Sequence, residues 1–333
     1  MKRLTMQVLK FVAGILLLVH GAPAKAQVDP HFSQYYANPL WLNPSLTGII
    51  DGDYRVTANY RRQWSALNAP FTTAAISADV FPRANWGLGF MVLGQKAADG
   101  GYHYVNGYLN FAYQVHLSQY QVLAGAFGLG MLNRWLDPTK FRFGDQYNPV
   151  VGYDPNQATS EVFTNTSATS FDISAGLMYF DGNPNKKVNA FAGASIYHPN
   201  QPKDVFITNG EGSIPMRYNF HTGAKIKLSE VADLTPHFIY IRQGNAQEIT
   251  GGMYLDYKLE SMKDMIFGAT YRVNDAIVPN VGFQVNGLVV GMSYDVNISQ
   301  LRAATAFRGG FEFSISYIHR KKITDPKFIC PRL

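Results

Sequence analysis

Apolar and polar residues alternate with a period of two in many short stretches of this 333-residue chain. In 109–117, one set of alternate positions holds Leu, Phe, Tyr, Val and Leu, and the other holds Asn, Ala, Gln and His. The stretches 54–61, 171–179, 288–297 and 311–317 repeat the pattern. Successive side chains of a strand point to opposite faces, so each stretch predicts a strand with one apolar and one polar face.

Counting such stretches gives about 14 candidate strands, a number found in transmembrane barrels. They begin near residues 54, 71, 85, 104, 121, 169, 188, 218, 234, 249, 264, 280, 288 and 310. Soluble β-sandwiches also alternate, so the pattern alone leaves the class open.

The amino-acid composition favours a membrane protein over a soluble domain. Charged residues make up 16% of the chain, against about 25% in soluble domains, and aromatic residues make up 14%. No stretch after the N-terminal segment looks like a transmembrane helix. If the chain spans a membrane, its backbone N–H and C=O groups must therefore be hydrogen-bonded between the strands of a closed barrel. We therefore predict an all-β fold, a transmembrane antiparallel up-and-down β-barrel over residues 54–319, with apolar side chains facing lipid.

The lengths of the connections between the predicted strands test the barrel prediction independently, because outer-membrane barrels alternate short periplasmic turns with long external loops. Short turns are predicted near Pro82–Ala84, Ser118–Tyr120, Asp181–Lys187, Val231–Asp233, Ser261–Lys263 and Asn286–Gly287. Longer connections are predicted at 64–70, 96–103, 134–168, 198–217, 244–248, 273–279 and 297–309, of which 244–248 is short for an external loop. An even strand count places both mature termini in the periplasm.

The N-terminus has the organisation of a secretory signal peptide. Lys2, Arg3 and Lys10 precede the apolar run Phe11–Val19, and Ala24–Ala26 fits a small-x-small cleavage site. The apolar run is far shorter than the ~20 residues that a membrane-spanning helix needs. Residues 1–26 are therefore expected to be removed near Ala26/Gln27, and the mature protein to reach the outer membrane.

Residues 27–53 fall outside the strand pattern. They are rich in proline, asparagine and aromatic residues, a composition that resists regular structure. This irregular segment either plugs the barrel or provides a docking surface for other proteins. Arg55, Asn59 and Arg61, on the lumen side of the first strand, are candidates to hold a plug by hydrogen bonds.

Residues 320–333 form a short basic tail with five basic residues and one acidic residue. Pro326 and Pro331 argue against another strand. The tail either meets only solvent or anionic lipid headgroups, or it binds an acidic surface of a periplasmic partner. Cys330, the single cysteine, excludes an internal disulfide and is either an inert thiol or a contact with another protein.

Charge and motifs exclude several functions. The net charge is +6, but residues 1–26 hold four basic residues and no acid, which leaves +2 for the mature chain and no argument for nucleic-acid binding. No catalytic, cofactor or metal motif occurs, so none of these sites is predicted. Ser195 and His221 lie on neighbouring predicted strands and could form a catalytic pair. The simpler interpretation is that both are polar residues facing the lumen.

One loop carries candidate ligands for a cation. Asp137 and Asp145 lie close together in Asp137–Tyr147, and loop carboxylates can bind metal ions. A solvated turn anchored by Phe141 and Phe143 is the simpler alternative.

Residues 29–48, DPHFSQYYANPLWLNPSLTG, strongly resemble the opening of the PorP/SprF family of type IX secretion outer-membrane proteins in Bacteroidota. The resemblance continues in order at Tyr60–Trp64, Asp172–Gly176, Gln243–Asn245, Tyr271–Asp275, Ser293–Asn297, Gly309–Phe313 and Cys330–Leu333. Together these motifs cover nearly the whole mature chain.

The resemblance implies a non-enzymatic component that helps export or anchor cargo such as gliding adhesins. The implied partners are the periplasmic ring and lipoprotein components, the secreted cargo with its C-terminal signal, and the lipid bilayer. The sequence leaves open whether this copy is a core component or a dedicated partner of one cargo. The alternative is a porin or a transporter of hydrophobic solutes.

The candidate partner-binding residues lie in the two irregular segments. They are Asp29, Phe32, Gln34, Tyr35, Asn38 and Asn43 in the N-terminal segment, and Arg320, Lys321, Lys322, Cys330 and Arg332 in the tail.

Overall fold

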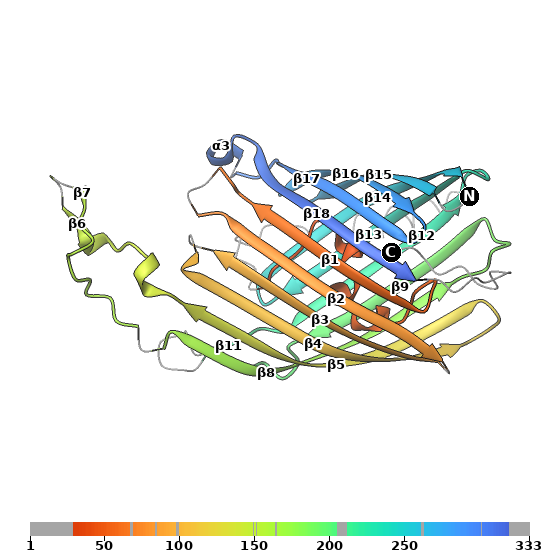
Figure 1. Ribbon diagram of the computed structural model, residues 1–333, viewed down its shortest axis with the longest axis horizontal. Coiled ribbons are helices and arrows are strands. Elements are labelled where there is room, and N and C mark those ends of the chain that lie inside the picture. Colours follow the sequence, from red (N-terminus) through yellow and green to blue (C-terminus); the bar gives the residue numbers. More distant parts are fainter. Residues whose placement is uncertain are drawn as a thin grey trace, which may run out of the picture.

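The computed structural model describes residues 29–66, 69–83, 85–97, 100–148, 150, 152–163, 165–204, 212–260, 263–300 and 302–319. Within these residues, fourteen antiparallel strands form one closed barrel (Figure 1). The strands are β1 (Tyr54–Gln63), β2 (Phe71–Arg83), β3 (Trp86–Ala97), β4 (Tyr102–His116), β5 (Gln121–Leu136), β8 (Ser167–Asp181), β9 (Val188–Tyr197), β12 (Arg217–Lys227), β13 (Ala232–Gln243), β14 (Ala246–Glu260), β15 (Lys263–Arg272), β16 (Ala276–Val285), β17 (Leu288–Asn297) and β18 (Arg308–His319). The predicted signal peptide and basic tail lie outside the described residues.

Each strand pairs with its neighbour in the chain, and β1 pairs with β18 to close the ring. The predicted up-and-down barrel of about 14 strands is therefore confirmed. Closure gives every strand two hydrogen-bonded neighbours, which is what a strand inside a membrane requires. No helix in the described part of the chain is long and apolar enough to cross a membrane.

The alternation predicted from the sequence sets the two faces of the wall. In β4, Leu109 is 69% exposed on the outside, whereas Asn110 is 3% exposed in the lumen. In β8, Leu177 faces out and Asp172 and Ser174 are buried. The outer surface is thus apolar, whereas the inner surface carries buried polar side chains together with the apolar residues that contact the N-terminal segment.

The two ends of the barrel differ, and we call them the turn end and the loop end. The start of β1 and the end of β18 lie at the turn end, where the connections are short, and the longest connections lie at the loop end (Figure 1). Two predicted long connections are wrong. Gly244 and Asn245 alone join β13 to β14, and residues 273–275 join β15 to β16. Gly244 has a positive φ of 56°, which suits a tight turn, and the strand pairing then continues to Ala246.

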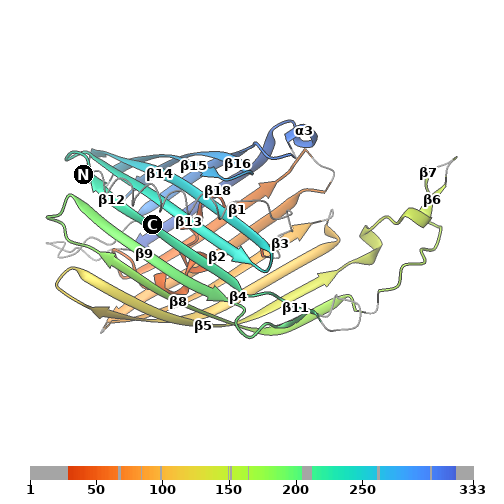
Figure 2. The ribbon, with the colours of Figure 1, turned by 180° about the vertical axis from the view of Figure 1, so that it is seen from behind.

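The longest described connection projects beyond the loop end as an arm (Figure 2). It contains the short helices η4 (Pro138–Lys140) and η5 (Gly144–Gln146) and the small hairpin of β6 (Tyr147–Asn148) and β7 (Gly152–Tyr153). Phe143 packs between Phe141 and Phe163. The arm therefore has local structure of its own, and the short helices and the small hairpin were not predicted from the sequence.

Residues 29–50 lie inside the barrel (Figure 1). They form η1 (Tyr35–Ala37), α2 (Pro39–Leu42) and η2 (Pro44–Leu46). Their apolar side chains are almost fully buried against inward residues of the wall, in clusters that include Leu40 with Leu93 and Leu46 with Val122. We call residues 29–50 the plug, and the core of the molecule is the contact between the plug and the barrel.

Candidate functional site: the plugged lumen

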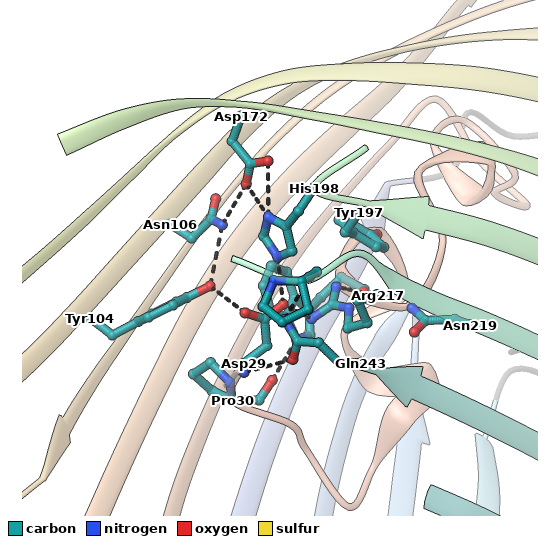
Figure 3. Close-up of polar contacts among 12 residues, drawn as sticks. Asp29, Pro30, Tyr104, Asn106, Asp172, Tyr197, His198, Arg217, Asn219 and Gln243 are labelled. Atoms are coloured by element: carbon teal, nitrogen blue, oxygen red, sulfur yellow. Dashed lines mark hydrogen bonds and ion pairs between the residues drawn. The ribbon is translucent and has the colours of Figure 1, made fainter. Parts of the chain in front are cut away.

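The first residue of the plug is fixed by a buried cluster of charges (Figure 3). The Asp29 carboxylate lies 2.8 Å from His198 Nε2 and 2.8 Å from Arg217 Nη1, and it accepts a hydrogen bond from the Tyr104 hydroxyl at 3.1 Å. The backbone N–H of Asp29 donates to Gln243 Oε1 at 3.0 Å. These partners come from β4, β12, β13 and the residue that follows β9, so one carboxylate joins distant parts of the wall.

His198 extends this cluster to β8. Its Nδ1 lies 2.9 Å from Asp172, which also accepts a hydrogen bond from Asn106 at 3.1 Å. Burial alone would lower the pKa of His198, but the carboxylates of Asp29 and Asp172 outweigh burial and raise it to about 9. Burial opposes ionisation of Asp29, yet His198 and Arg217 hold its pKa below the usual range. Both members of the pair are therefore charged at neutral pH.

Arg217 also holds the middle of the plug. Its guanidinium lies 3.9 Å from the ring centre of Trp41 and 4.0 Å from that of Tyr197. The Tyr197 hydroxyl donates to the carbonyl of Leu40 at 2.9 Å. A buried arginine with an ion pair and two aromatic faces is stabilised on several sides.

A second cluster fixes the next turn of the plug to β17 and β18. The backbone N–H groups of Ser33 and Gln34 donate to the Glu312 carboxylate at 2.6 and 3.0 Å. The Ser33 hydroxyl donates to Asp295 at 2.6 Å, and Arg61 pairs with the same Asp295 at 2.7 Å. Hydrogen bonds to charged groups are stronger than neutral ones, particularly in a buried site.

Two of the three lumen residues predicted to hold the plug do so. Arg61 donates to the carbonyl of His31 at 2.6 Å, and Arg55 donates to that of Leu46 at 3.1 Å. The side-chain atoms of Asn59 are buried without a hydrogen-bond partner among the residues that the structure describes.

A third contact lies at the C-terminal end of α2. Asn43 Nδ2 donates to the carbonyl of Leu177 at 3.0 Å and lies 3.1 Å from His221 Nε2. The Ser195 hydroxyl donates to the carbonyl of Leu42 at 2.8 Å. Ser195 and His221 thus both contact the plug, as expected for polar lumen residues.

Glycines let the plug approach the wall closely. A Cβ at Gly87 would lie 2.6 Å from the carbonyl oxygen of Thr47, and one at Gly176 would collide with the Asn43 side chain. Gly48 packs against Gly87 with a φ of 74°, a conformation that glycine adopts without strain.

The structure places the six predicted residues of the N-terminal segment together inside the barrel. All of them are buried: Asp29, Phe32, Gln34, Tyr35, Asn38 and Asn43. A partner protein would reach them only if the plug moved. The five candidates in the tail, Arg320, Lys321, Lys322, Cys330 and Arg332, lie outside the described residues.

The sequence analysis missed the wall residues that bind the plug, among them His198, Arg217, Asp295 and Glu312, and it missed Asp172, which pairs with His198. Four of them carried a usable signal, because they are charged residues at alternate, inward positions of apolar strands. A charged side chain at such a position requires a partner in the lumen.

Asp145, one of the two candidate cation ligands in the arm, has hydrogen-bond partners within the arm. Asp145 accepts hydrogen bonds from the backbone N–H and hydroxyl of Ser160, at 2.6 and 2.7 Å, and these bonds lower its pKa. Its carboxylate thereby ties two parts of the arm together. No group of three or more potential metal ligands occurs among the described residues.

The comparisons agree with this architecture. The sequence model of the family described as type IX secretion system membrane protein PorP/SprF matches residues 24–317. No curated protein matches the chain. Among solved structures, the toluene transporter TbuX of Ralstonia pickettii is similar, with a TM-score of 0.54 and 9% identity over 90% of this chain and 96% of that one. The monoaromatic hydrocarbon channel CymD has a TM-score of 0.50 and 10% identity, over the same shares. At such identity the likeness shows the fold alone.

Proposed function

Because the chain belongs to the PorP/SprF family of type IX secretion system membrane proteins, we propose that it is an outer-membrane component of that system which acts by binding other proteins. The barrel crosses the outer membrane with its turn end in the periplasm and its loop end outside, since short turns face the periplasm in such barrels. Both ends of the mature chain are then periplasmic.

The observation that carries this proposal is that the plug occupies the lumen and is held there by the wall. Three sets of buried contacts hold the plug, at Asp29, at Ser33–Gln34 and at Leu42–Asn43. The ion pairs of Asp29 with His198 and Arg217 are costly to separate once buried. A barrel whose interior is occupied by its own chain is suited to serve as a fixed platform for partners.

Two surfaces are available to those partners. The turn end, with the basic residues 320–333, is the side on which periplasmic ring and lipoprotein components would bind, through an acidic surface. The arm at the loop end is the side on which exported cargo would pass. It exposes apolar side chains, including Val150 at 91% and Val162 at 84%, and exposed apolar groups are typical of interaction sites.

A hydrophobic-solute transporter is the second candidate. Its support is the fold, which is shared with the toluene transporter TbuX, and a cavity beside the plug lined partly by apolar residues. Against it stands the number of charged contacts that solute passage would have to break or bypass. Conductance of the purified barrel separates the two candidates.

The test is a comparison of the surface and secreted proteins of a strain that lacks the gene with those of its complemented parent. Loss of one large surface protein indicates a dedicated export partner, and loss of many cargos indicates a core component. An unchanged set of exported proteins, in a strain without a second copy of the gene, contradicts the proposal. Co-purification of ring components with the full chain, weakened by deletion of 320–333, tests the periplasmic surface.

A further inference from the structure

The exposed charges of the barrel strands are all of one sign. Every aspartate and glutamate of these strands whose side chain the structure describes is buried on the inward side. They are Asp79, Asp172, Asp181, Asp233, Glu248, Asp256, Asp264, Asp295 and Glu312. Among the described lysines and arginines of the same strands, four are exposed: Arg62, Lys96, Arg242 and Arg308. All four lie at the loop end, as the first or the second-last residue of a strand.

Three of the four gather on adjoining strands, because β18, β1, β2 and β3 lie side by side (Figure 1). Arg62 on β1 pairs in register with Thr72 on β2, which pairs with Lys96 on β3. Neighbouring strands are about 4.8 Å apart, so the Cα atoms of Arg62 and Lys96 are about 10 Å apart and their long side chains can reach one group. Arg308 begins β18, on the other side of β1. We call Arg62, Lys96 and Arg308 the basic row.

The basic row has no partner within the described part of the chain. Its three side chains make no ion pair and no hydrogen bond there, whereas Arg61, the inward neighbour of Arg62, pairs with Asp295 at 2.7 Å. The outward side of a barrel strand faces lipid. The charges of the basic row are therefore available to a partner at the surface of the membrane.

Aromatic side chains indicate the level of the basic row in the membrane. Arg62 shares one register row with Phe311 on β18 and Tyr294 on β17, and both rings are exposed. Outer-membrane barrels carry girdles of aromatic residues at the two membrane interfaces. The basic row thus lies where the hydrocarbon gives way to the headgroups, and cations at that level are attracted to anionic lipids.

We propose that the basic row binds the phosphate groups of lipopolysaccharide in the outer leaflet. A guanidinium group matches phosphate through two parallel hydrogen bonds, and a lysine supplies a point charge. The inference rests on the proposed function, because it requires the loop end to be outside. A lipid bound by Arg62 and Arg308 would contact both β1 and β18, the two strands that close the ring.

Arg242 does not belong to this site. It lies on β13, across the barrel from β1, and its guanidinium donates to the carbonyl of Gly244 at 3.4 Å. It is the second-last residue of its strand and exposed, as Arg62 is. Arg242→Gln is therefore a matched control for the loss of a basic residue at the loop end.

Native mass spectrometry of the purified full-length protein tests the site, with lipid A, the phosphate-bearing anchor of lipopolysaccharide, as the probe. Lipid A from which the phosphates have been removed is compared with it. The variants are Arg62→Gln, Lys96→Gln and Arg308→Gln, singly and together, beside Arg242→Gln and the charge-conserving Arg62→Lys. Folding is verified by the faster gel migration of unheated barrels, and the single variants suffice if the triple variant fails to fold.

The wild type should prefer the phosphorylated lipid. Each charge removed from the basic row should weaken binding about fivefold, and the triple variant about a hundredfold. Arg242→Gln should bind as the wild type does, and Arg62→Lys should retain most of the affinity. Equal binding of the two lipids by the wild type, or the same loss in Arg242→Gln as in Arg62→Gln, would overturn the proposal.

The placement of the loop end is tested separately in intact cells. Val150 in the arm is 91% exposed, so a membrane-impermeant maleimide should label Val150→Cys above the level of the unsubstituted chain, whose single cysteine is Cys330. Labelling only after lysis would contradict the placement in the proposed function and, with it, an outer-leaflet lipid. Labelling of intact cells, combined with a purified protein that ignores the phosphates, would overturn the lipid site alone.

Discussion

Asp29 and His198 form a buried ion pair of 2.8 Å across a sequence separation of 169 residues. Asp29 opens the plug, and His198 follows β9 at the wall, so the pair ties the two parts of the molecule together (Figure 3). The same carboxylate binds Arg217, so the loss of Asp29 alone would remove two of the ion pairs that attach the plug.

Asp29→Asn should loosen the plug while the barrel stays closed. The substitution leaves Arg217 buried without its counter-ion and His198 with Asp172 alone, and breaking a buried ion pair in this way costs about 3–5 kcal/mol. Chymotrypsin, whose aromatic and leucine targets are frequent in 29–50, measures the effect as faster cleavage of the plug. Asp154→Asn in the arm is the control and should leave cleavage unchanged. Equal protection in Asp29→Asn and the wild type would show that the ion pair is dispensable.

Attachment of the plug should also depend on pH. The pKa of His198 rises from 6.5 to about 9 in the folded state, so its contribution is complete below pH 6.5 and is lost as the pH rises through 9. The pKa of Asp29 is lowered from 3.8, so its contribution is present above that value and is lost as the pH falls.

Channel conductance recorded over a pH series should therefore stay low near neutrality and increase above about pH 9. In His198→Gln, no increase should occur at that pH, because no titrating group remains at the position. A step near pH 9 that persists in His198→Gln would assign the transition to another group.

Gly87→Ala tests the close approach between plug and wall. The added Cβ would lie 2.6 Å from the carbonyl oxygen of Thr47, and overpacking of this kind costs about 1–3 kcal/mol. We expect faster chymotrypsin cleavage of the plug. In Gly94→Ala, on the same strand, the nearest atoms are 3.9 Å away, and cleavage should match the wild type. If the two variants behave alike, the glycine is not needed for plug packing.

Leu109→Arg tests the lipid-facing surface. Leu109 lies in the middle of β4 and is 69% exposed. An arginine facing lipid near the membrane centre destabilises a barrel by about 2–4 kcal/mol. Reversible urea unfolding in lipid vesicles should show this loss, and Leu109→Phe should show little. A neutral effect of the arginine would place this position outside the membrane.

The sequence was sufficient to predict the barrel because lipid imposes a strict alternation on each strand. Most strand starts lie within three residues of those expected, and Arg55 and Arg61 hold the plug as predicted. Alternation alone does not identify the partner of each charged side chain that faces the lumen. Ser33 and Glu312, for example, are 279 residues apart, and their contact depends on closure of the ring and on the path of the plug.

The wrong and missing predictions also reflect what a periodic pattern cannot show. The turn at Gly244–Asn245 was predicted as a loop because the polar residues after it resemble loop residues, although inward positions of a barrel strand are polar as well. The small hairpin in the arm depends on a contact between Tyr147 and Tyr153, and two-residue strands leave no periodic pattern.

Single-channel recording of the purified wild-type barrel in planar bilayers at neutral pH tests the central claim, that the lumen is closed by the chain's own N-terminal segment and the protein acts through partners. The account predicts a nearly silent bilayer for the wild type, and frequent openings for Asp29→Asn inserted at the same density. Stable open channels in the wild type, with no change in Asp29→Asn, would contradict the account and favour a solute channel.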